Sequence, residues 1–339
     1  MRVVSRLLMA TLLTATAFAP SATAATTRTY LAARQADSIV MGYSNIAGDE
    51  LPAWVALDGG FFSRNGLNVD AQLLSGGANT VAALLAGQVQ FAQAGGSEAL
   101  NATANGADLV VVATIAPVYP YIFEASSDIA SVGDLVGKKV GVATFGGSAD
   151  VATRVALRNA GINPDEDVTI IATGSAANRT AALLSGAIQG GMAGGPPDTL
   201  DLEAQGLHPL FDLAALKLPA ANTAVIAQRG WVNANRDIVQ RYVDSLVQAT
   251  AFLKQNKPAT VAILKKYYKS DDDAAMGAAF DFHAGEVVAS LPFPRPEQFA
   301  DAIAQLSVSN PRIRDVDLGR LLDPSFVQDA ADRGLADAR

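Results

Sequence analysis

The sequence contains no cysteine and only two histidines among its 339 residues. The lack of cysteine excludes disulfide bonds, thiolate metal sites and a cysteine nucleophile. It also excludes the lipid anchor of a lipoprotein, which is attached to a cysteine at the cleavage point. Charged residues make up 17% of the chain and apolar residues 50%, so the chain can bury a large core and is not a disordered one. Its length is sufficient for two domains of ordinary size.

Familiar catalytic motifs are also missing. The sequence has no HExxH, CxxC, Gly-x-Ser-x-Gly or P-loop pattern. His208 lies beside a predicted strand and His283 on a predicted helix, and we interpret both as structural residues. The acidic run at 271–273 lacks the spaced ligands of a calcium loop, so it predicts the N-terminus of a helix. The sequence therefore offers few of the acids, bases or nucleophiles that an enzyme needs.

Residues 1–24 have the pattern of a cleaved secretory signal. Arg2 and Arg6 precede a short apolar run from Leu7 to Phe18, and Ala22-Thr23-Ala24 supplies the small-x-small cleavage pattern. The alternative is an uncleaved membrane anchor, but the run is too short to span a bilayer. The formal net charge of −8 argues against a nucleic acid or an anionic membrane surface as partner. We therefore expect a periplasmic protein.

Predicted strands and helices alternate along most of the chain, which is typical of parallel sheets built from β-α-β units. The first group of predicted strands spans residues 38–43, 67–74, 88–94 and 108–115. The second group spans residues 139–143, 168–172 and 187–192, with a further strand near Leu210. A lone strand is predicted at 223–227. The remainder, beginning with an amphipathic helix over 236–254, is predicted to be helical and to pack on the first group.

One segment of the first group is repeated in the second. AALLAGQVQFAQAGG, at 82–96, aligns without gaps on AALLSGAIQGGMAGG, at 181–195, which lies 99 residues further on. Chance similarity between two segments rich in alanine and leucine is the alternative explanation. Both copies occupy the same place in the order of strands and helices, so the repeat predicts two lobes of like topology.

Glycine-rich turns lead into several predicted helices. They lie at 75–79, 95–97 and 145–148, each after a predicted parallel strand. In open α/β sheets, ligands bind at the carboxyl ends of the strands. Helix N-termini there present unpaired N–H groups and partial positive charge. Plain turn formation and capping are the alternative for any one turn, but three turns in both lobes favour a ligand cleft between the lobes.

The sequence resembles a known family at 53–69, 76–77, 83–92, 134–142 and 146–161, with motifs AWVALDGGFFSRNGLNV, GG, ALLAGQVQFA, DLVGKKVGV and GGS…AG. It is similar to the solute-binding proteins of nitrate, sulfonate and taurine ABC importers, grouped with the NMT1/THI5-like thiamine-pyrimidine proteins. The resemblance covers roughly residues 38–255. It implies an α/β type II periplasmic binding protein fold with two Rossmann-like lobes. Lobe 1 would comprise 37–125 plus 224–339, and lobe 2 would comprise 126–223, with a two-crossing hinge near Glu124 and Asn222.

The resemblance also places ligand-binding residues in the loops after the strands. These are Ser44, Asn45, Gly76, Gly77, Asn79, Gly96, Ser97, Gly146, Gly147 and Ser148, joined by Pro196 and by Asn222 and Thr223 at the second crossing. Phe145, like Tyr43, Tyr119 and Tyr121, offers a ring for stacking, with buried packing as the alternative.

The expected solute is a small organic anion such as a sulfonate or carboxylate, because helix N-termini favour anions. Arg179 is placed either to pair with that anion or to meet solvent or the acids near Asp165. Asp150 uses part of the positive potential at its helix start, and Asp49 and Glu50 are placed to face an amine. We expect a monomer without cofactor or metal that docks on the permease and ATPase of an ABC importer.

Three alternatives remain open at this point. The solute could be nitrate or a thiamine-pyrimidine precursor, or the protein could be a sensor that binds the same kind of solute. The family also includes a pyrimidine synthase, an enzyme whose reaction needs a histidine and a PLP-bearing lysine in the first lobe, with a cysteine-rich motif. Here the first lysine is Lys138 and the first histidine is His208, so the sequence argues against that enzyme.

Overall fold

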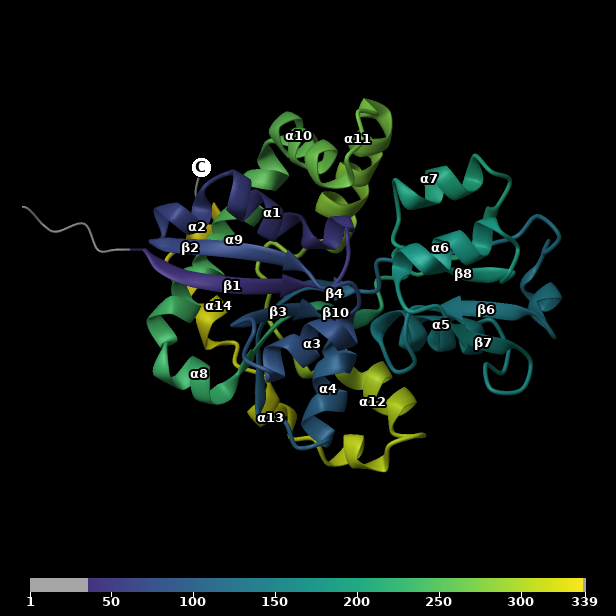
Figure 1. The fold of residues 1–339 in the computed structure, drawn as a ribbon, viewed down its shortest axis with the longest axis horizontal. Coiled ribbons are helices and arrows are strands. Elements are labelled where there is room, and N and C mark those ends of the chain that lie inside the picture. Colours follow the sequence, from purple (N-terminus) through teal and green to yellow (C-terminus); the bar gives the residue numbers. More distant parts are fainter. Residues whose placement is uncertain (1–35, 338–339) are drawn as a thin grey trace, which may run out of the picture. The chain divides into compact units, whose positions relative to one another are not determined.

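The computed structural model describes residues 36–337, and the expected signal segment at 1–24 lies outside them. The described residues form two α/β lobes, each built on one five-stranded sheet (Figure 1). None of the helices in this part of the chain is long and apolar enough to cross a membrane.

The first sheet has the strand order β2-β1-β3-β10-β4. Its strands are β1 (Asp37–Tyr43), β2 (Leu67–Leu73), β3 (Phe91–Ala94), β4 (Leu109–Val118) and β10 (Pro219–Gln228). Strand β1 is parallel to β2 and β3, whereas β10 is antiparallel to both of its neighbours. The strand predicted at 223–227 is thus not a lone strand but the fourth strand of this sheet.

The second sheet has the equivalent order β7-β6-β8-β5-β9. Its strands are β5 (Ile122–Ala125), β6 (Lys139–Val142), β7 (Thr169–Ala172), β8 (Gly190–Ala193) and β9 (His208–Asp212). Strand β5 is antiparallel to β8 and β9, as β10 is to its neighbours in the first sheet. The predicted likeness of the two lobes is confirmed, and the repeat explains it: α3 (Gly77–Leu85) and β3 reappear 99 residues later as α6 (Ala176–Leu184) and β8.

The chain passes between the two sheets twice, and both passages lie slightly earlier than the sequence analysis placed them. Strand β5 already belongs to the second sheet, so lobe 2 begins before residue 122 rather than at 126. Strand β10 pairs with β4 from Pro219 onward, so the return to lobe 1 precedes residue 219 rather than 224. The apolar sequence runs from β4 into β5 without a glycine. Pro117 lies within β4 and Pro120 between the two strands, and together they gave too weak a boundary signal.

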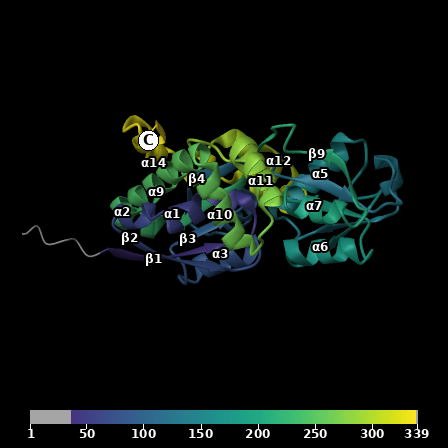
Figure 2. The same ribbon diagram turned by 90° about the horizontal axis from the view of Figure 1, so that it is seen from above.

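The helices cover both faces of each sheet, as Figure 2 shows for α5 and α6 on opposite faces of the second sheet. Lobe 1 also carries α1 (Leu51–Asp58), α2 (Phe61–Arg64) and α4 (Gly96–Ala104); lobe 2 carries α5 (Ser148–Asn159) and α7 (Asp198–Glu203). The C-terminal part contributes α8 (Arg229–Ala234), α9 (Arg236–Gln255), α10 (Lys257–Tyr268), α11 (Asp273–Phe282), α12 (Ala300–Leu306), α13 (Leu318–Leu321) and α14 (Ser325–Asp332).

The C-terminal helices pack on lobe 1, as predicted. Tyr242 of α9 is fully buried and stacks on Phe91 of β3 at 3.9 Å between ring centroids and on Phe62 of α2 at 5.0 Å. The acidic run at 271–273 begins α11, where both N–H groups of residues 274 and 275 donate to the Asp272 carboxylate at 2.9 Å. That interpretation of the run as a helix start is confirmed.

Glu124 is a carboxyl group buried within the second sheet. Its side chain is 0% exposed, and neither of its oxygens has a hydrogen-bond partner among residues 36–337. Burial raises its pKa to about 7, and the charge of Glu203 adds to this effect. A raised pKa means that the folded state favours the protonated acid. The contribution of Glu124 to the free energy of unfolding is therefore fully present below pH 4.5 and is lost as the pH rises through about 7.

We expect Glu124→Gln to remove this pH-dependent loss, because glutamine has the same size and does not ionise. The free energy of unfolding should rise by on the order of 1 to 2 kcal/mol at pH 8 relative to the unchanged protein, with little difference near pH 4. Urea unfolding across this pH range measures the effect, with Glu166→Gln, at an exposed acid, as the control. Parallel pH profiles for Glu124→Gln and the unchanged protein would contradict the assignment.

Candidate functional site

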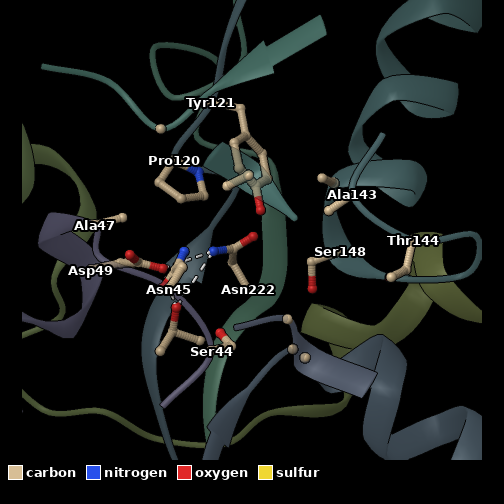
Figure 3. Close-up of a pocket in the computed structure, with 18 of the residues that line it drawn as sticks. Ser44, Asn45, Ala47, Asp49, Pro120, Tyr121, Ala143, Thr144, Ser148 and Asn222 are labelled. Carbon is tan, nitrogen blue, oxygen red and sulfur yellow. Dashed lines mark hydrogen bonds between the residues drawn. The ribbon is translucent and has the colours of Figure 1, made fainter. Parts of the chain in front are cut away.

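A cavity lies between the two lobes, at the carboxyl ends of the parallel strands (Figure 3). Its lining comprises Ser44, Asn45, Ile46, Ala47, Asp49, Gly76, Gly77, Gly95, Glu98, Pro120, Tyr121, Ala143, Thr144, Gly147, Ser148, Ala149, Ala176, Arg179, Gly194, Asp198, Asn222 and Thr223. The lining is rich in small residues. It therefore brings backbone groups close to whatever occupies the cavity.

Four helices begin at the cavity wall. Gly77 and Gly95 mark the starts of α3 and α4 in lobe 1, and Ser148 and Ala176 mark the starts of α5 and α6 in lobe 2. Each of these helices has at least nine residues, so its dipole and its unpaired N–H groups favour negative charge at this end. The strand order of both sheets thus places four helix N-termini, each with partial positive charge, around the cavity.

The two lobes touch directly beside the cavity. The Ser97 and Ser148 hydroxyl oxygens lie 3.1 Å apart, and Asn101 Nδ2 donates to the Gly146 carbonyl at 3.1 Å. Ser97 also donates to Glu98 Oε2 at 2.7 Å, and Ser148 donates to the same oxygen at 3.4 Å. Burial raises the pKa of Glu98, and these hydrogen bonds oppose the shift.

An acid occupies the hinge side of the cavity. Asp49 follows β1, and its Oδ2 accepts hydrogen bonds from Asn222 Nδ2 at 3.2 Å and from Thr223 Oγ1. Asp49 is only 3% exposed, and burial raises its pKa despite these bonds. The Tyr121 ring stands above Asn222 with its hydroxyl directed toward the amide (Figure 3). Burial raises the pKa of Tyr121, so its hydroxyl remains a hydrogen-bond donor.

One basic side chain lines the cavity from lobe 2. Arg179, on α6, is 4% exposed, and its stem passes over the second sheet. A Cβ atom on Gly191 would lie 3.2 Å from Arg179 Cδ, and one on Gly141 would lie 3.3 Å from Cγ, so the glycines of β6 and β8 leave room for this stem. The neighbouring acid is Asp198, whose pKa burial raises to about 6 against the effect of Arg179.

Arg179 has no salt bridge within the described part of the chain, and its buried Nε has no hydrogen-bond partner there. Burial lowers its pKa, and the nearby Tyr121 and Asp198 oppose this shift. The alternative that Arg179 meets solvent or the acids near Asp165 is wrong. Asp165 pairs instead with Arg154 at 2.5 Å and Arg158 at 3.3 Å.

Eight of the residues assigned to ligand binding line the cavity. They are Ser44, Asn45, Gly76, Gly77, Gly147, Ser148, Asn222 and Thr223. Sequence position placed them correctly because each follows a strand end or the second crossing. That they bind a solute stays a prediction.

Other assigned residues lie outside the cavity. The Asn79 amide donates to the Ser75 carbonyl at 2.9 Å as a local cap, and a Cβ on Gly96 would lie 2.5 Å from Ala221 in the core. Ser97 lines a smaller adjoining cavity with Tyr119. Pro196 precedes α7 but is not part of the lining.

Phe145 and Gly146 are not in the cavity lining but in an outer groove along α3 and α4, which adjoins the cavity and shares Glu98, Thr144 and Gly147 with it. The Phe145 ring is 62% exposed, so it neither stacks in the cavity nor packs in the core. The reason is the left-handed turn at Gly146, with a φ of +74°, after which Gly147 and Ser148 enter the lining while the preceding side chain does not.

Several further expectations are resolved by the packing. Glu50 does not face a solute, because it is fully buried outside the lining, where burial raises its pKa strongly. Asp150 caps its own loop, accepting from Gly146 N at 2.8 Å and pairing with Arg154 at 2.8 Å. Tyr43 packs edge-on against Trp54 at 6.5 Å between centroids, in the core of lobe 1.

The two histidines lie outside the lining. His283 is fully buried, and burial lowers its pKa to about 3. His208 is half-buried on β9. Among residues 36–337, no group of three histidine, cysteine or acidic side chains is placed to hold a metal ion.

The sequence analysis missed some lining residues, among them Glu98, Thr144, Ala176, Gly194 and Asp198. The internal repeat could have predicted two of them. Applying its offset of 99 residues to Gly77 gives Ala176, and applying it to Gly95 gives Gly194. Glu98 and Asp198 carried no such signal, because acids in the first turn of a helix are common on protein surfaces.

Residues 47–260 match the protein family described as NMT1/THI5 like. The chain belongs to this family. The NMT1/THI5-like match covers most of both sheets and ends in α10, so it includes every residue that lines the cavity except Ser44, Asn45 and Ile46. No curated protein sequence matches the chain at a significant level.

Solved structures confirm the periplasmic binding protein fold of this NMT1/THI5-like chain. The periplasmic aliphatic sulphonate binding protein SsuA from Escherichia coli superposes with a TM-score of 0.68 and 20% identity, over 85% of this chain and 92% of that one. The periplasmic nitrate-binding protein NrtA from Synechocystis PCC 6803 gives 0.69 and 15%, over 88% and 89%. The desulfurization enzyme DSZB gives 0.63 and 19%, over 88% and 99%.

Proposed function

We propose that the chain is the extracytoplasmic solute-binding protein of an ABC importer and that it binds a small organic anion, such as a sulfonate or carboxylate. The solute would lie between the lobes, and the closed protein would deliver it to a membrane permease. The periplasm is the proposed location, reached through the secretory signal expected at 1–24. The family and the fold, which sulfonate- and nitrate-binding proteins share, support this proposal.

The observation that carries the proposal is Arg179. Arg179 is 4% exposed and makes no salt bridge in the described part of the chain, with Asp198 acting on it only at longer range, so its guanidinium is costly to bury. A sulfonate or carboxylate in the cavity would supply that partner through charge-assisted, bidentate hydrogen bonds. The four helix N-termini around the same space add further donors.

The contacts between the lobes support closure around the solute. Ser97 and Asn101 of lobe 1 reach Ser148 and Gly146 of lobe 2 next to the cavity. The two crossings form the only links of backbone between the sheets of the described residues, and a pair of such links can act as a hinge. Solute bound between the lobes would stabilise the closed arrangement.

We propose binding without turnover. The cavity lining contains hydroxyl groups, but no histidine to serve as a base for Ser148, and the sequence has no cysteine. DSZB shares the fold and is an enzyme, so the fold itself does not decide between binding and catalysis. The composition of the cavity favours binding.

The proposal predicts that small organic anions raise the thermal unfolding temperature of the purified protein. Binding stabilises the folded state by about 2.7 kcal/mol when the ligand concentration is 100 times Kd. Differential scanning fluorimetry against sulfonates, carboxylates, nitrate and pyrimidines measures this effect. Stabilisation by nitrate or a pyrimidine alone would support the corresponding alternative, and no stabilisation by any anion would contradict the proposal.

A further inference from the structure

Glu98 lines the cavity at the point where three helices begin. It lies in the first turn of α4, in lobe 1. A Cβ atom on Gly77, the first residue of α3, would lie 2.4 Å from Glu98 Oε1, and one on Gly147, directly before α5, would lie 2.9 Å from the same oxygen. Glycine at these two positions therefore leaves room for the Glu98 side chain, whose carboxyl group lies beside the N-termini of α3 and α5 as well as that of its own helix.

The groups around this carboxyl group donate hydrogen bonds to it. The Ser97 hydroxyl donates to Glu98 Oε2 at 2.7 Å, and the Ser148 hydroxyl donates to the same oxygen at 3.4 Å. Burial raises the pKa of Glu98, but these hydroxyls and the backbone N–H groups of Glu98 and Ser148 lower it by hydrogen bonding. Because a backbone N–H group can only donate, its position here favours the ionised carboxylate. Glu98 thus places a negative charge at this end of the cavity.

The three helices that begin beside Glu98 have no side-chain cap at the residue before them. Each of α3, α4 and α5 follows a glycine, which has no side chain to accept from the first N–H groups of the helix. The contrast is α6, on the opposite face of the second sheet from α5 (Figure 2), where the Ser175 hydroxyl accepts from Asn178 N at 3.1 Å. Uncapped helix N-termini favour a neighbouring anion, and Glu98 already occupies that place.

The basic side chain of the cavity belongs to the remaining helix. Arg179 is on α6 of lobe 2, whereas Glu98 is on α4 of lobe 1. Burial is the main cause of the raised pKa of Tyr121, and the charge of Arg179 opposes this rise whereas that of Glu98 adds to it. Both charges therefore act on one side chain of the lining. A solute whose first anionic group lies at Arg179 would bring a second such group within the influence of Glu98.

We propose that Glu98 is a specificity-determining residue that excludes a second negative group of the solute, so that the cavity selects singly charged anions over doubly charged ones. This inference rests on the proposed function, because it concerns the anion in the same cavity. Without Glu98, the N-termini of α3, α4 and α5 would offer a second anionic group a favourable place. With Glu98 present, that group meets a like charge at short distance, which opposes its binding.

Pairs of anions that differ by one negative group test this inference. Isothermal titration calorimetry compares propane-1-sulfonate with propane-1,3-disulfonate, and butanoate with butanedioate, at pH 8 and constant salt concentration. The unchanged protein should bind the singly charged member of a pair about tenfold to 100-fold tighter. In Glu98→Gln, which keeps the size of the side chain and an acceptor oxygen, this ratio should fall toward one or reverse. Glu166→Gln, the same change at an exposed acid of lobe 2, should keep the ratio.

Each outcome decides one of the two proposals. If the unchanged protein binds both members of a pair equally, or the doubly charged member tighter, the inference is wrong and the proposed function stands. A ratio that is unchanged in Glu98→Gln but falls in Asp49→Asn would overturn the assignment to Glu98. If no anion of either kind binds, the proposed function fails and the inference fails with it. Circular dichroism verifies the folding of each variant, and Glu98→Ala, which removes the same charge, should shift the ratio in the same direction.

Discussion

We expect Arg179→Gln to lower the affinity of the protein for organic anions by about 100-fold. Removing one partner of a buried, hydrogen-bonded charge pair costs about 2–5 kcal/mol, and each 1.4 kcal/mol corresponds to a factor of ten in Kd. Glutamine is short of the guanidinium by several atoms and carries no charge, so it cannot replace the bidentate contact. Isothermal titration calorimetry with the anion that binds most tightly measures the loss.

The same variant should not unfold more easily in the absence of ligand. Arg179 is buried without a salt bridge within residues 36–337, so its charge opposes folding, and glutamine removes that cost. We therefore expect an unchanged or higher unfolding temperature for the unliganded variant. Lower affinity with undiminished stability would be the signature of a residue held for binding.

Arg154→Gln is the matched control, since Arg154 is also largely buried in lobe 2 but lies outside the cavity. Arg154 pairs with Asp150 at 2.8 Å and with Asp165 at 2.5 Å. Its loss should lower the free energy of unfolding by about 1–3 kcal/mol and leave the affinity nearly unchanged. Equal losses of affinity in both variants, or none in Arg179→Gln, would contradict the role assigned to Arg179.

The contrast between these arginines explains where sequence reasoning succeeded and where it stopped. The repeat predicted two lobes because a sequence segment that forms a helix and a strand in one β-α-β unit forms them again in another. Strand ends and glycine turns are local features, so they placed Gly77, Ser148 and Asn222 at the cavity. From the sequence alone, Arg179 and Arg154 are both predicted to lie on helices. Only the packing of the second sheet shows that Arg179 is buried without a salt bridge whereas Arg154 is paired with acids.

Side-chain direction was the other limit. Phe145 and Ser148 lie three residues apart in one glycine-rich turn, yet one side chain faces the outer groove and the other faces the cavity. A left-handed glycine between them decides this, and such a conformation is not specified by the sequence of the turn alone. The passages between the sheets were misplaced for a related reason: β4 and β5 form one apolar stretch, and only strand pairing assigns its two parts to different sheets.

Gly95 should control closure of the lobes, because nothing larger than hydrogen fits at this position. It precedes α4 with an extended backbone, φ −72° and ψ 151°, which any residue can adopt. A Cβ atom there would lie 1.9 Å from the Ser148 hydroxyl of lobe 2 and 2.3 Å from Glu98 Oε2. A valine at this position would therefore obstruct the contact with lobe 2, whereas within lobe 1 it would displace the flexible end of the Glu98 side chain.

We expect Gly95→Val to lower solute affinity by about 10- to 100-fold while the unliganded protein keeps its unfolding temperature. Overpacking of a tight contact costs about 1–3 kcal/mol, and the part that arises from the contact with Ser148 falls on the closed arrangement alone. Calorimetry measures the affinity, and small-angle X-ray scattering with and without ligand measures the compaction that closure should cause. Gly230→Val, at a position with open space around it, is the control and should change neither.

Two results would argue against this role of Gly95. Full affinity with normal compaction in Gly95→Val would mean that the contact between Gly95 and Ser148 is not needed for binding. A lower unfolding temperature of the unliganded variant would mean that the contact already stabilises the protein before solute arrives. Loss of affinity together with loss of compaction is expected only if both lobes contact the solute at once. In that case, any free energy that opposes closure weakens the free energy of binding by the same amount.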